Sequence, residues 1–375
     1  MWVACGCSAR ASLTGFGAPL RRSPAPRALA WPAQMGPFVT MMAAGLAVLA
    51  LVACGDDEGA ELDAPPGATI VLDFQPNAVH APLYAAEAEG LFAEQGVEVE
   101  IREPGSTADG AKLLEAGRAD LAVLDVNDVG IVRERGLDVV AVAALIQRPL
   151  ASVITSDPSA IPTPADLAGA EVGVTGVRSD DAVLDTVLEA GELGPGSVDR
   201  VTIGFAAVPA LASGRVDAAT AFWNAEGVEL RRRGVPIGEF RVDELGAPRY
   251  PELVLVARGD RMPDEPEVVC PVLEGVARSF DAMERDSEAT LKAMIGELEA
   301  SDPGSLRAQF AELIAADAFS PVENGRADPA LRAETIPQWQ RWATKRGVLE
   351  AGAAAQAEVS DGFAPDQIRE CALRG

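Results

Sequence analysis

The feature that most constrains the fold is an alternation of short apolar strands with helical segments, which occurs in both halves of the chain. In the first half, four apolar runs have the length of strands: 70–72, 97–101, 121–124 and 139–144. Helical patterns lie between them at 78–90, 108–116 and 129–135. Strands that alternate with helices of about ten residues are typical of βαβ units, so we predict a parallel α/β sheet.

The second half repeats this plan. Strands are predicted at 170–174 and 201–203, and helices at 182–190 and 207–213. The segment Leu114–Val123 recurs as Leu211–Thr220. In both copies, a helix end is followed by a glycine, a basic residue, and an aspartate that precedes a buried strand. The repeat predicts two α/β lobes with a ligand site between them.

Two segments flanked by Pro and Gly are predicted to cross between the lobes, namely Leu150–Thr155 and Glu252–Ala257. The chain then leaves the first lobe once and returns to it once. We therefore predict lobe one as residues 68–154 plus 255–375, including a helical tail, and lobe two as residues 155–254.

The N-terminal 53 residues are predicted to be a leader that is cleaved. Ala43–Ala53 is an apolar run too short to span a bilayer, with the length of a signal-peptide core. The segment Leu51–Gly55 resembles a bacterial lipobox, which implies cleavage before Cys54 and lipidation of its thiol. The alternative is a cysteine that follows an ordinary secretory leader. Residues 54–67 are polar and lack apolar periodicity, which predicts a flexible tether.

Charge and cysteine content limit the possible partners. The formal net charge is −26, which argues against nucleic acid and against a basic membrane-binding patch. Cys270 and Cys371 lie beyond the leader. They could form a disulfide or remain two buried free thiols, and the sequence does not decide between these alternatives. They do not resemble a metal site, and we expect neither a metal nor a cofactor.

Trp339 and Trp342, at i and i+3, are predicted to mark a packing face of the tail.

The turn after the first strand is the strongest candidate for a binding segment. Pro76 prevents the strand from continuing, and Asn77 is a plausible N-cap of the next helix. In open α/β sheets, such a turn lies at the carboxyl edge, where ligands bind. It gathers five side chains that suit ligand contact: Asp73, Phe74, Asn77, the chain's only histidine His80, and Tyr84.

Seven segments together carry a family resemblance: Leu72–Tyr84, Glu89–Phe92, Gly96–Glu100, Gly117–Ala122, Val142–Leu150, Gly173–Asp180 and Ala221–Gly227. The chain resembles the substrate-binding proteins of ABC importers, and more closely the branch that binds the thiamine precursor hydroxymethylpyrimidine. The resemblance implies a two-lobed periplasmic-binding-protein type II fold, with two Rossmann-like lobes, a hinge and C-terminal helices. It also implies a monomeric, lipid-anchored, extracytoplasmic protein that delivers a small heteroaromatic solute to a permease and its ATPase.

The site residues follow from this resemblance. Phe74, Tyr84 and Trp223 offer faces for a flat ring. Polar partners for ring nitrogens and an exocyclic amine are predicted to be Asp73, Asn77, His80, Asn224 and Glu226. Helix-opening residues that can hold an anion or a carbonyl are Ser106, Thr107, Arg178 and Ser179. Each of the main residues also has a structural alternative: a helix cap for Asn77, a satisfied buried histidine for His80, core packing for Trp223, and a solvated acid for Glu226.

Other functions remain open at this point. Relatives of the same fold bind riboflavin, sulfonates, nitrate or taurine-like solutes, and a lipoprotein sensor is a further alternative. The family also contains pyrimidine-synthesising enzymes, which carry a lysine near the histidine and a Cys-rich signature. Here no lysine precedes Lys112, so we predict a binding protein rather than an enzyme. The corresponding turn of the family usually has Trp where this chain has Phe74. The phenylalanine keeps a stacking face but lacks the N–H donor of the indole.

Overall fold

The computed structural model describes residues 65–105, 109–262, 266–298, 301–319, 322–323, 326–327, 329–332, 334–364 and 366–372. The predicted leader, Cys54 and most of the tether lie outside these ranges, as do Ser106 and Thr107. Within the described ranges, every helix falls short of the length and apolar character that a membrane span requires.

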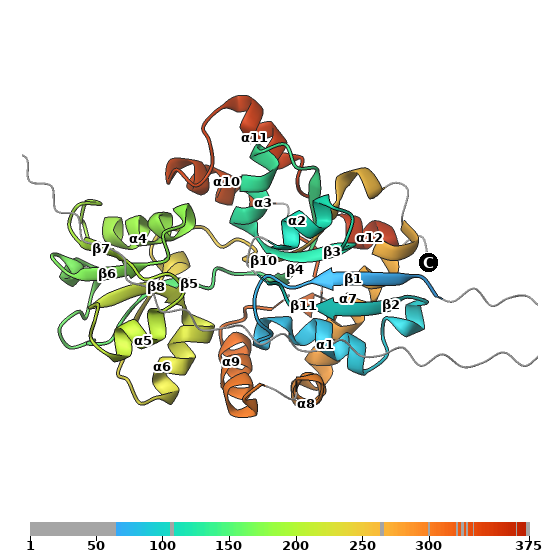
Figure 1. Cartoon of the computed structure of the whole chain (residues 1–375), viewed down its shortest axis with the longest axis horizontal. Coiled ribbons are helices and arrows are strands. Elements are labelled where there is room, and N and C mark those ends of the chain that lie inside the picture. Colours follow the sequence, from blue (N-terminus) through green and yellow to red (C-terminus); the bar gives the residue numbers. More distant parts are fainter. Residues whose placement is uncertain are drawn as a thin grey trace, which may run out of the picture. The chain divides into compact units, whose positions relative to one another are not determined.

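The first sheet has the strand order β2-β1-β3-β10-β4 (Figure 1). Its strands are β1 (Gly67–Val71), β2 (Glu98–Arg102), β3 (Leu121–Asp125), β4 (Val139–Ile146) and β10 (Leu253–Arg258). Strand β1 is parallel to β2 and β3, whereas β10 runs antiparallel to both β3 and β4. Ile70 and Val71 belong to hydrophobic clusters on opposite faces, so helices cover this sheet on both sides.

The helices of this lobe come from both ends of the chain. The N-terminal ones are the 3₁₀ turns η1 (Ala78–His80) and η2 (Ala93–Gln95), and the helices α1 (Ala81–Ala88), α2 (Asp109–Glu115) and α3 (Val126–Glu134). The tail adds α7 (Pro266–Arg285), α8 (Ser287–Glu297), α9 (Pro303–Ala315) and α12 (Gln367–Ala372), and the short strands β11 (Val322–Glu323) and β12 (Arg326–Ala327). Residues of α7, α8 and α9 pack with α1 in one hydrophobic cluster.

The second sheet has the order β7-β6-β8-β5-β9. Its strands are β5 (Ala151–Thr155), β6 (Glu171–Val174), β7 (Asp199–Thr202), β8 (Ala218–Phe222) and β9 (Gly238–Arg241). The helical segments are η3 (Pro164–Leu167), α4 (Arg178–Ala190), α5 (Ala207–Ala212), the π-helical turn η4 (Trp223–Gly227), α6 (Val228–Arg232) and η5 (Val242–Glu244), whereas η6 (Gly259–Arg261) follows β10 of the first sheet. The predicted α/β fold with two Rossmann-like sheets is confirmed.

The sequence repeat has the same structural role in both sheets. Gly117 and Gly214 adopt positive φ angles of 63° and 66°, as a C-capping glycine does. Asp120 Oδ2 then accepts a hydrogen bond from Thr69 N at 2.8 Å, and Asp217 Oδ2 accepts one from Glu171 N at 2.8 Å. Each aspartate therefore ties the beginning of its own strand to the neighbouring parallel strand, β1 in the first sheet and β6 in the second.

The helix α10 (Ile336–Lys345) contacts elements of both lobes, and α11 (Ala353–Ser360) follows it. Trp339 Nε1 donates to Asn127 Oδ1 at 2.9 Å, next to β3. Trp342 Nε1 donates to Thr186 Oγ1 at 3.1 Å, in α4. Both indoles are buried, so the predicted packing face of the tail is confirmed.

Two predicted helix boundaries are wrong. The segment 78–90 is divided into η1 and α1, because Pro82 lies in the first turn of α1 and the regular helix begins only at Ala81. The helix predicted at 182–190 begins four residues earlier, because α4 starts at Arg178. There Asp180 accepts a hydrogen bond from Thr175 N at 2.7 Å, which stabilises an earlier helix start.

Cys270 on α7 and Cys371 on α12 form a disulfide, which decides between the two alternatives left by the sequence. The cross-link joins residues that are 101 positions apart. It therefore fixes the end of the chain to the lobe-one helices.

We expect the double variant Cys270→Ser/Cys371→Ser to lose about 2–4 kcal/mol of unfolding free energy, because a long closed loop restricts the unfolded chain. Urea unfolding monitored by circular dichroism measures this loss. A reducing agent should destabilise the parent protein to a similar degree and leave the double variant unchanged. Equal stability of parent and variant would contradict the prediction.

Candidate functional site

The carboxyl ends of parallel strands form two sheet edges. In the first sheet, β1 and β3 are parallel neighbours, so the segments Asp73–His80 and Asp125–Asp128 follow them at one edge, called the first edge below. In the second sheet, β6 is parallel to β7 and β8. The segments that follow these three strands form the second edge: Thr175–Asp180, Ile203–Phe205 and Trp223–Glu226.

His80 holds the turn of the first edge together. The imidazole is fully buried, its Nδ1 accepts a hydrogen bond from Asn77 N at 3.2 Å, and its Nε2 lies 2.8 Å from Asp73 Oδ1. Because Nδ1 accepts from a backbone N–H, the neutral ring carries its proton on Nε2 and donates it to Asp73. The structure therefore has the satisfied buried histidine that was the alternative to ligand contact.

Asn77 caps the turn η1. Its Oδ1 accepts from Val79 N at 3.1 Å, and its Nδ2 donates to Gln75 O at 3.1 Å. Both ends of the amide thus have partners within the turn, as in a capping box. Asn77 and His80 belong to one turn, and their hydrogen bonds connect Asp73, Gln75 and Val79 on either side of it.

The first edge concentrates carboxyl groups. Asp125 ends β3, and burial raises its pKa. Asp128 is partly exposed to solvent, but many protein atoms surround its carboxyl group. This desolvation, followed by repulsion from Asp125 and Asp73, raises the pKa of Asp128 to about 7. Among the described residues, no group of three or more His, Cys, Asp and Glu side chains is arranged to hold a metal.

The second edge places Glu226 next to Asp180. Asp180 Oδ2 accepts from Thr220 Oγ1 at 2.8 Å, and Glu226 Oε2 accepts from Phe222 N at 3.0 Å. Burial, followed by repulsion from Asp180, raises the pKa of Glu226. Glu226 is therefore a partly enclosed acceptor rather than a freely solvated acid.

Two exposed phenylalanines show that the two edges face one another. Phe74 follows β1 and Phe205 follows β7, and their ring centroids lie 6.1 Å apart with an interplanar angle of 38°. Phe74 is 42% exposed and Phe205 is 69% exposed. Sequence reasoning missed Phe205, although it follows a strand of the second lobe much as Phe74 follows one of the first.

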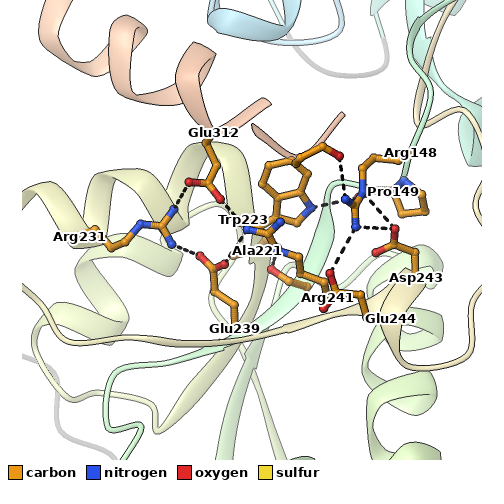
Figure 2. Close-up of polar contacts among 12 residues, drawn as sticks. Arg148, Pro149, Ala221, Trp223, Arg231, Glu239, Arg241, Asp243, Glu244 and Glu312 are labelled. Carbon is orange, nitrogen blue, oxygen red and sulfur yellow. Dashed lines mark hydrogen bonds and ion pairs between the residues drawn. The ribbon is translucent and has the colours of Figure 1, made fainter. Parts of the chain in front are cut away.

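Trp223 packs beside Pro149 and Arg148, which lie just before the first crossing segment (Figure 2). The indole is fully buried, and its Nε1 donates to Pro149 O at 3.0 Å. The Arg241 guanidinium lies 4.2 Å from the ring centroid and that of Arg148 lies 5.7 Å from it. This is the core position that was the alternative for Trp223. Stacking on a ligand, the predicted role, would require the ring to be uncovered.

The other predicted residues lie in different surroundings. Tyr84 is buried in the core of the first lobe, where burial and the nearby Glu103 and Glu87 raise its pKa. Asn224 is 1% exposed, and its Oδ1 has no hydrogen-bond partner among the described residues. Arg178 is exposed and Ser179 half-buried in the first turn of α4.

Helix α9 connects the first edge to the second lobe. Gln309 Oε1 accepts from Ala78 N at 3.3 Å, in η1. One turn later, Glu312 pairs with Arg241 at 2.6 Å and with Arg231 at 3.4 Å, as Figure 2 shows. A single face of α9 therefore contacts the Asp73–His80 turn of one lobe and the last strand of the other. No sequence pattern predicts these contacts.

Comparison with known proteins gives the family context. The family model described as NMT1/THI5 like matches residues 77–289. The chain is 31% identical over 251 residues to the formylaminopyrimidine-binding protein of Halalkalibacterium halodurans, covering 67% of this chain and 76% of that protein. It is 35% identical over 201 residues to the putative thiamine biosynthesis protein of Haemophilus influenzae, covering 52% of this chain and 63% of that protein. The predicted family resemblance is confirmed.

A further relative is named as an enzyme. The 4-amino-5-hydroxymethyl-2-methylpyrimidine phosphate synthase of Uromyces fabae is 24% identical over 229 residues, covering 58% of this chain and 67% of that protein. The relative with 31% identity is named as a binding protein instead.

Solved structures support the fold. The alkanesulfonate-binding protein SsuA of Xanthomonas axonopodis pv. citri has a TM-score of 0.60 at 18% identity, covering 80% of this chain and 98% of that chain. The nitrate-binding protein NrtA of Synechocystis PCC 6803 has a TM-score of 0.59 at 15% identity, covering 82% of this chain and 88% of that chain. Both are solute-binding proteins, and the second is named as periplasmic, so the predicted two-lobed architecture is confirmed at the level of the fold.

We expect Asp128→Asn to change the pH dependence of stability. The folded-state pKa of about 7 lies above the unfolded value of about 4, so ionisation of Asp128 costs the folded state increasingly as pH rises through this window. The variant should therefore match the parent near pH 4 and exceed it by about 1 kcal/mol at pH 8, after allowance for solvent screening. Melting temperatures across this range test it, with Asp361→Asn after α11 as control. A pH-independent difference would contradict the assignment.

We expect Glu312→Gln to weaken the contact between α9 and the second lobe, because Arg241 and Arg231 lose a shared carboxylate. The loss should be about 1 kcal/mol in urea unfolding. Glu288→Gln is the matched control, because its pair with Arg307 is exposed on both sides. Equal effects of the two substitutions would refute a connecting role for Glu312.

Proposed function

This chain belongs to the NMT1/THI5-like family, and we propose that it is the solute-binding protein of an ABC importer for a small heteroaromatic solute of the thiamine-pyrimidine type, such as hydroxymethylpyrimidine or its formylamino form. A relative named for formylaminopyrimidine binding supports this solute class. The fold supports a two-lobed binding mechanism.

The observation that carries the proposal is the exposed pair Phe74 and Phe205. One ring comes from each sheet edge, so a flat guest between them would contact both lobes at once. A guest in contact with a ring on either side, at about 3.5 Å each, needs roughly 7 Å between the outer rings. The observed centroid separation is 6.1 Å, so the rings must move apart by about 1 Å to admit it.

Electrostatics distinguishes the candidate solutes. Asp73 and Asp128 lie at the first edge and Glu226 at the second, where carboxylates accept N–H donors in charge-assisted hydrogen bonds. An amine-bearing ring satisfies these acceptors, whereas a sulfonate or nitrate meets like charge. This favours an aminopyrimidine over the anions named for the structural neighbours. Asn224, two residues before Glu226, offers a further buried acceptor, because its Oδ1 has no hydrogen-bond partner among the described residues.

The mechanism is closure about the two crossing segments. The ligand contacts both edges only when the lobes are together, so it stabilises that arrangement by its differential contacts. No covalent step is required. The synthase named among the relatives is the rival function, and the absence of a lysine before Lys112 in the sequence disfavours it.

The anchor and the transport partners complete the proposal. Cys54 lies outside the described residues, and its lipidation would fix the protein to the outer face of the membrane through the tether 54–67. The permease and ATPase of the importer would then receive the solute. Replacing Cys54 with Ser should release the protein from the membrane fraction, and retention would contradict the anchor.

We expect Phe205→Ala to weaken formylaminopyrimidine binding about tenfold, because one ring contact and its buried area are lost. Phe74→Ala should have a similar effect, and both rings are exposed enough for the variants to remain folded. Isothermal titration calorimetry measures the affinity. Ile314→Ala, which truncates an exposed apolar side chain on α9, is the control. Unchanged affinity in both phenylalanine variants would remove the site assignment.

A further inference from the structure

A separate cavity of about 580 Å³ lies between α4, α10 and the loop Leu245–Pro248. It belongs to neither sheet edge, and α10 lies beyond residues 77–289, which the family model matches. The cavity volume is in the range of small-molecule sites. Its lining residues come from α4 in the second lobe and from the C-terminal tail.

The charge in this cavity is opposite to that of the whole chain. Three of its lining residues are cationic, namely Arg341, Lys345 and Arg346, and one is anionic, Glu189. Lys345 Nζ lies 3.2 Å from Glu189 Oε1, and Arg346 pairs with the other oxygen of the same carboxylate. Arg341 is exposed and has no ion-pair partner among the residues that the structure describes. Three cations against one carboxylate leave two positive charges, in a chain with a net charge of −26.

One hydrogen-bond donor in the cavity wall is unsatisfied. The Arg346 side chain is only 13% exposed, and its Nε is buried without a hydrogen-bond partner in the described part of the chain. Its Nη1 donates to Asp185 O at 3.4 Å. The Nε itself is enclosed by protein, so the contribution of Arg346 to the cavity is the positive charge of its guanidinium.

The cavity also has an apolar, aromatic component. Trp342 lines it, and the Nε1 of this indole is already hydrogen-bonded to Thr186 Oγ1. Tyr250 lies against Trp342 with ring centroids 5.6 Å apart, so the indole is held in place. Aliphatic contacts come from the loop Leu245–Pro248. The lining therefore combines a fixed aromatic side chain with cationic groups.

We propose that this cavity is a second binding site, for a small organic anion with a flat or apolar body and one carboxylate or phosphate group. Arg341 and Lys345 bind the anionic group, and the body of the molecule packs on the loop Leu245–Pro248 and on the small exposed part of Trp342. The occupant contacts α4 and α10 together, so it stabilises the tail against the second lobe. This site is independent of the solute bound at the sheet edges.

The test uses the purified mature protein with three probes at matched ionic strength: phenyl phosphate, benzoate and inorganic phosphate. Calorimetry and thermal shift should show saturable binding of phenyl phosphate or benzoate, with a melting temperature that rises with probe concentration. Inorganic phosphate should bind at least about tenfold more weakly, because it lacks the body that packs on Trp342. No saturable binding of either organic probe, or equal binding of inorganic phosphate, would overturn the proposal.

Two sets of variants locate the binding. Arg341→Gln/Lys345→Gln should weaken the organic probe about tenfold or more, because charge-assisted contacts are lost. Arg118→Gln, at an exposed position outside the cavity, is the matched control and should bind normally. Phe205→Ala should also bind the probe normally, which separates this site from the sheet edges. Loss of probe binding in Phe205→Ala, or full binding in the Arg341/Lys345 variant, would refute the second site.

Discussion

The rest of the structure depends on the hydrogen bonding of residues 147–150, which join β4 of the first sheet to β5 of the second and lead into the predicted crossing segment Leu150–Thr155. This backbone is buried, so its polar groups need partners inside the protein. Leu150 N donates to Glu252 Oε2 at 2.9 Å, and Leu150 O accepts from Trp223 N at 3.1 Å. Pro149 O accepts from the Trp223 indole, and Gln147 N donates to Ala318 O at 2.7 Å. The second crossing segment, the second lobe and the tail therefore all supply hydrogen-bond partners to this one short segment.

This requirement explains why two conspicuous residues are buried. Glu252 begins the return to the first sheet, and its carboxyl lies beside Asp125, so burial and that neighbour raise its pKa well above the ordinary value. Two carboxyl groups so close together favour a shared proton over two charges. Trp223 serves the same segment through both its backbone and its indole. Their positions follow from the crossing, whichever solute the protein binds.

The residues that remain exposed at the two sheet edges are ones that the hydrogen bonding of the crossing does not use. Phe74 and Phe205 remain exposed and meet across the edges, while His80 and Asn77 are occupied with holding the turn. In the function we propose, the carboxyl groups beside them favour N–H donors over anions. Helix α9 adds a direct connection from this turn to the second lobe.

The sequence by itself determined the local features: the alternating strands and helices, the repeat whose Asp120 and Asp217 tie neighbouring strands, the Asn77 cap, and the packing face of Trp339 and Trp342. These depend on periodicity and on residues close together in the chain. Only the tertiary structure decided that Trp223 is buried, that Phe205 meets Phe74, and that Cys270 bonds Cys371. Each of these is a contact between residues that are far apart in sequence. Local pattern carries no information on such pairs, because chain folding and side-chain packing bring them together.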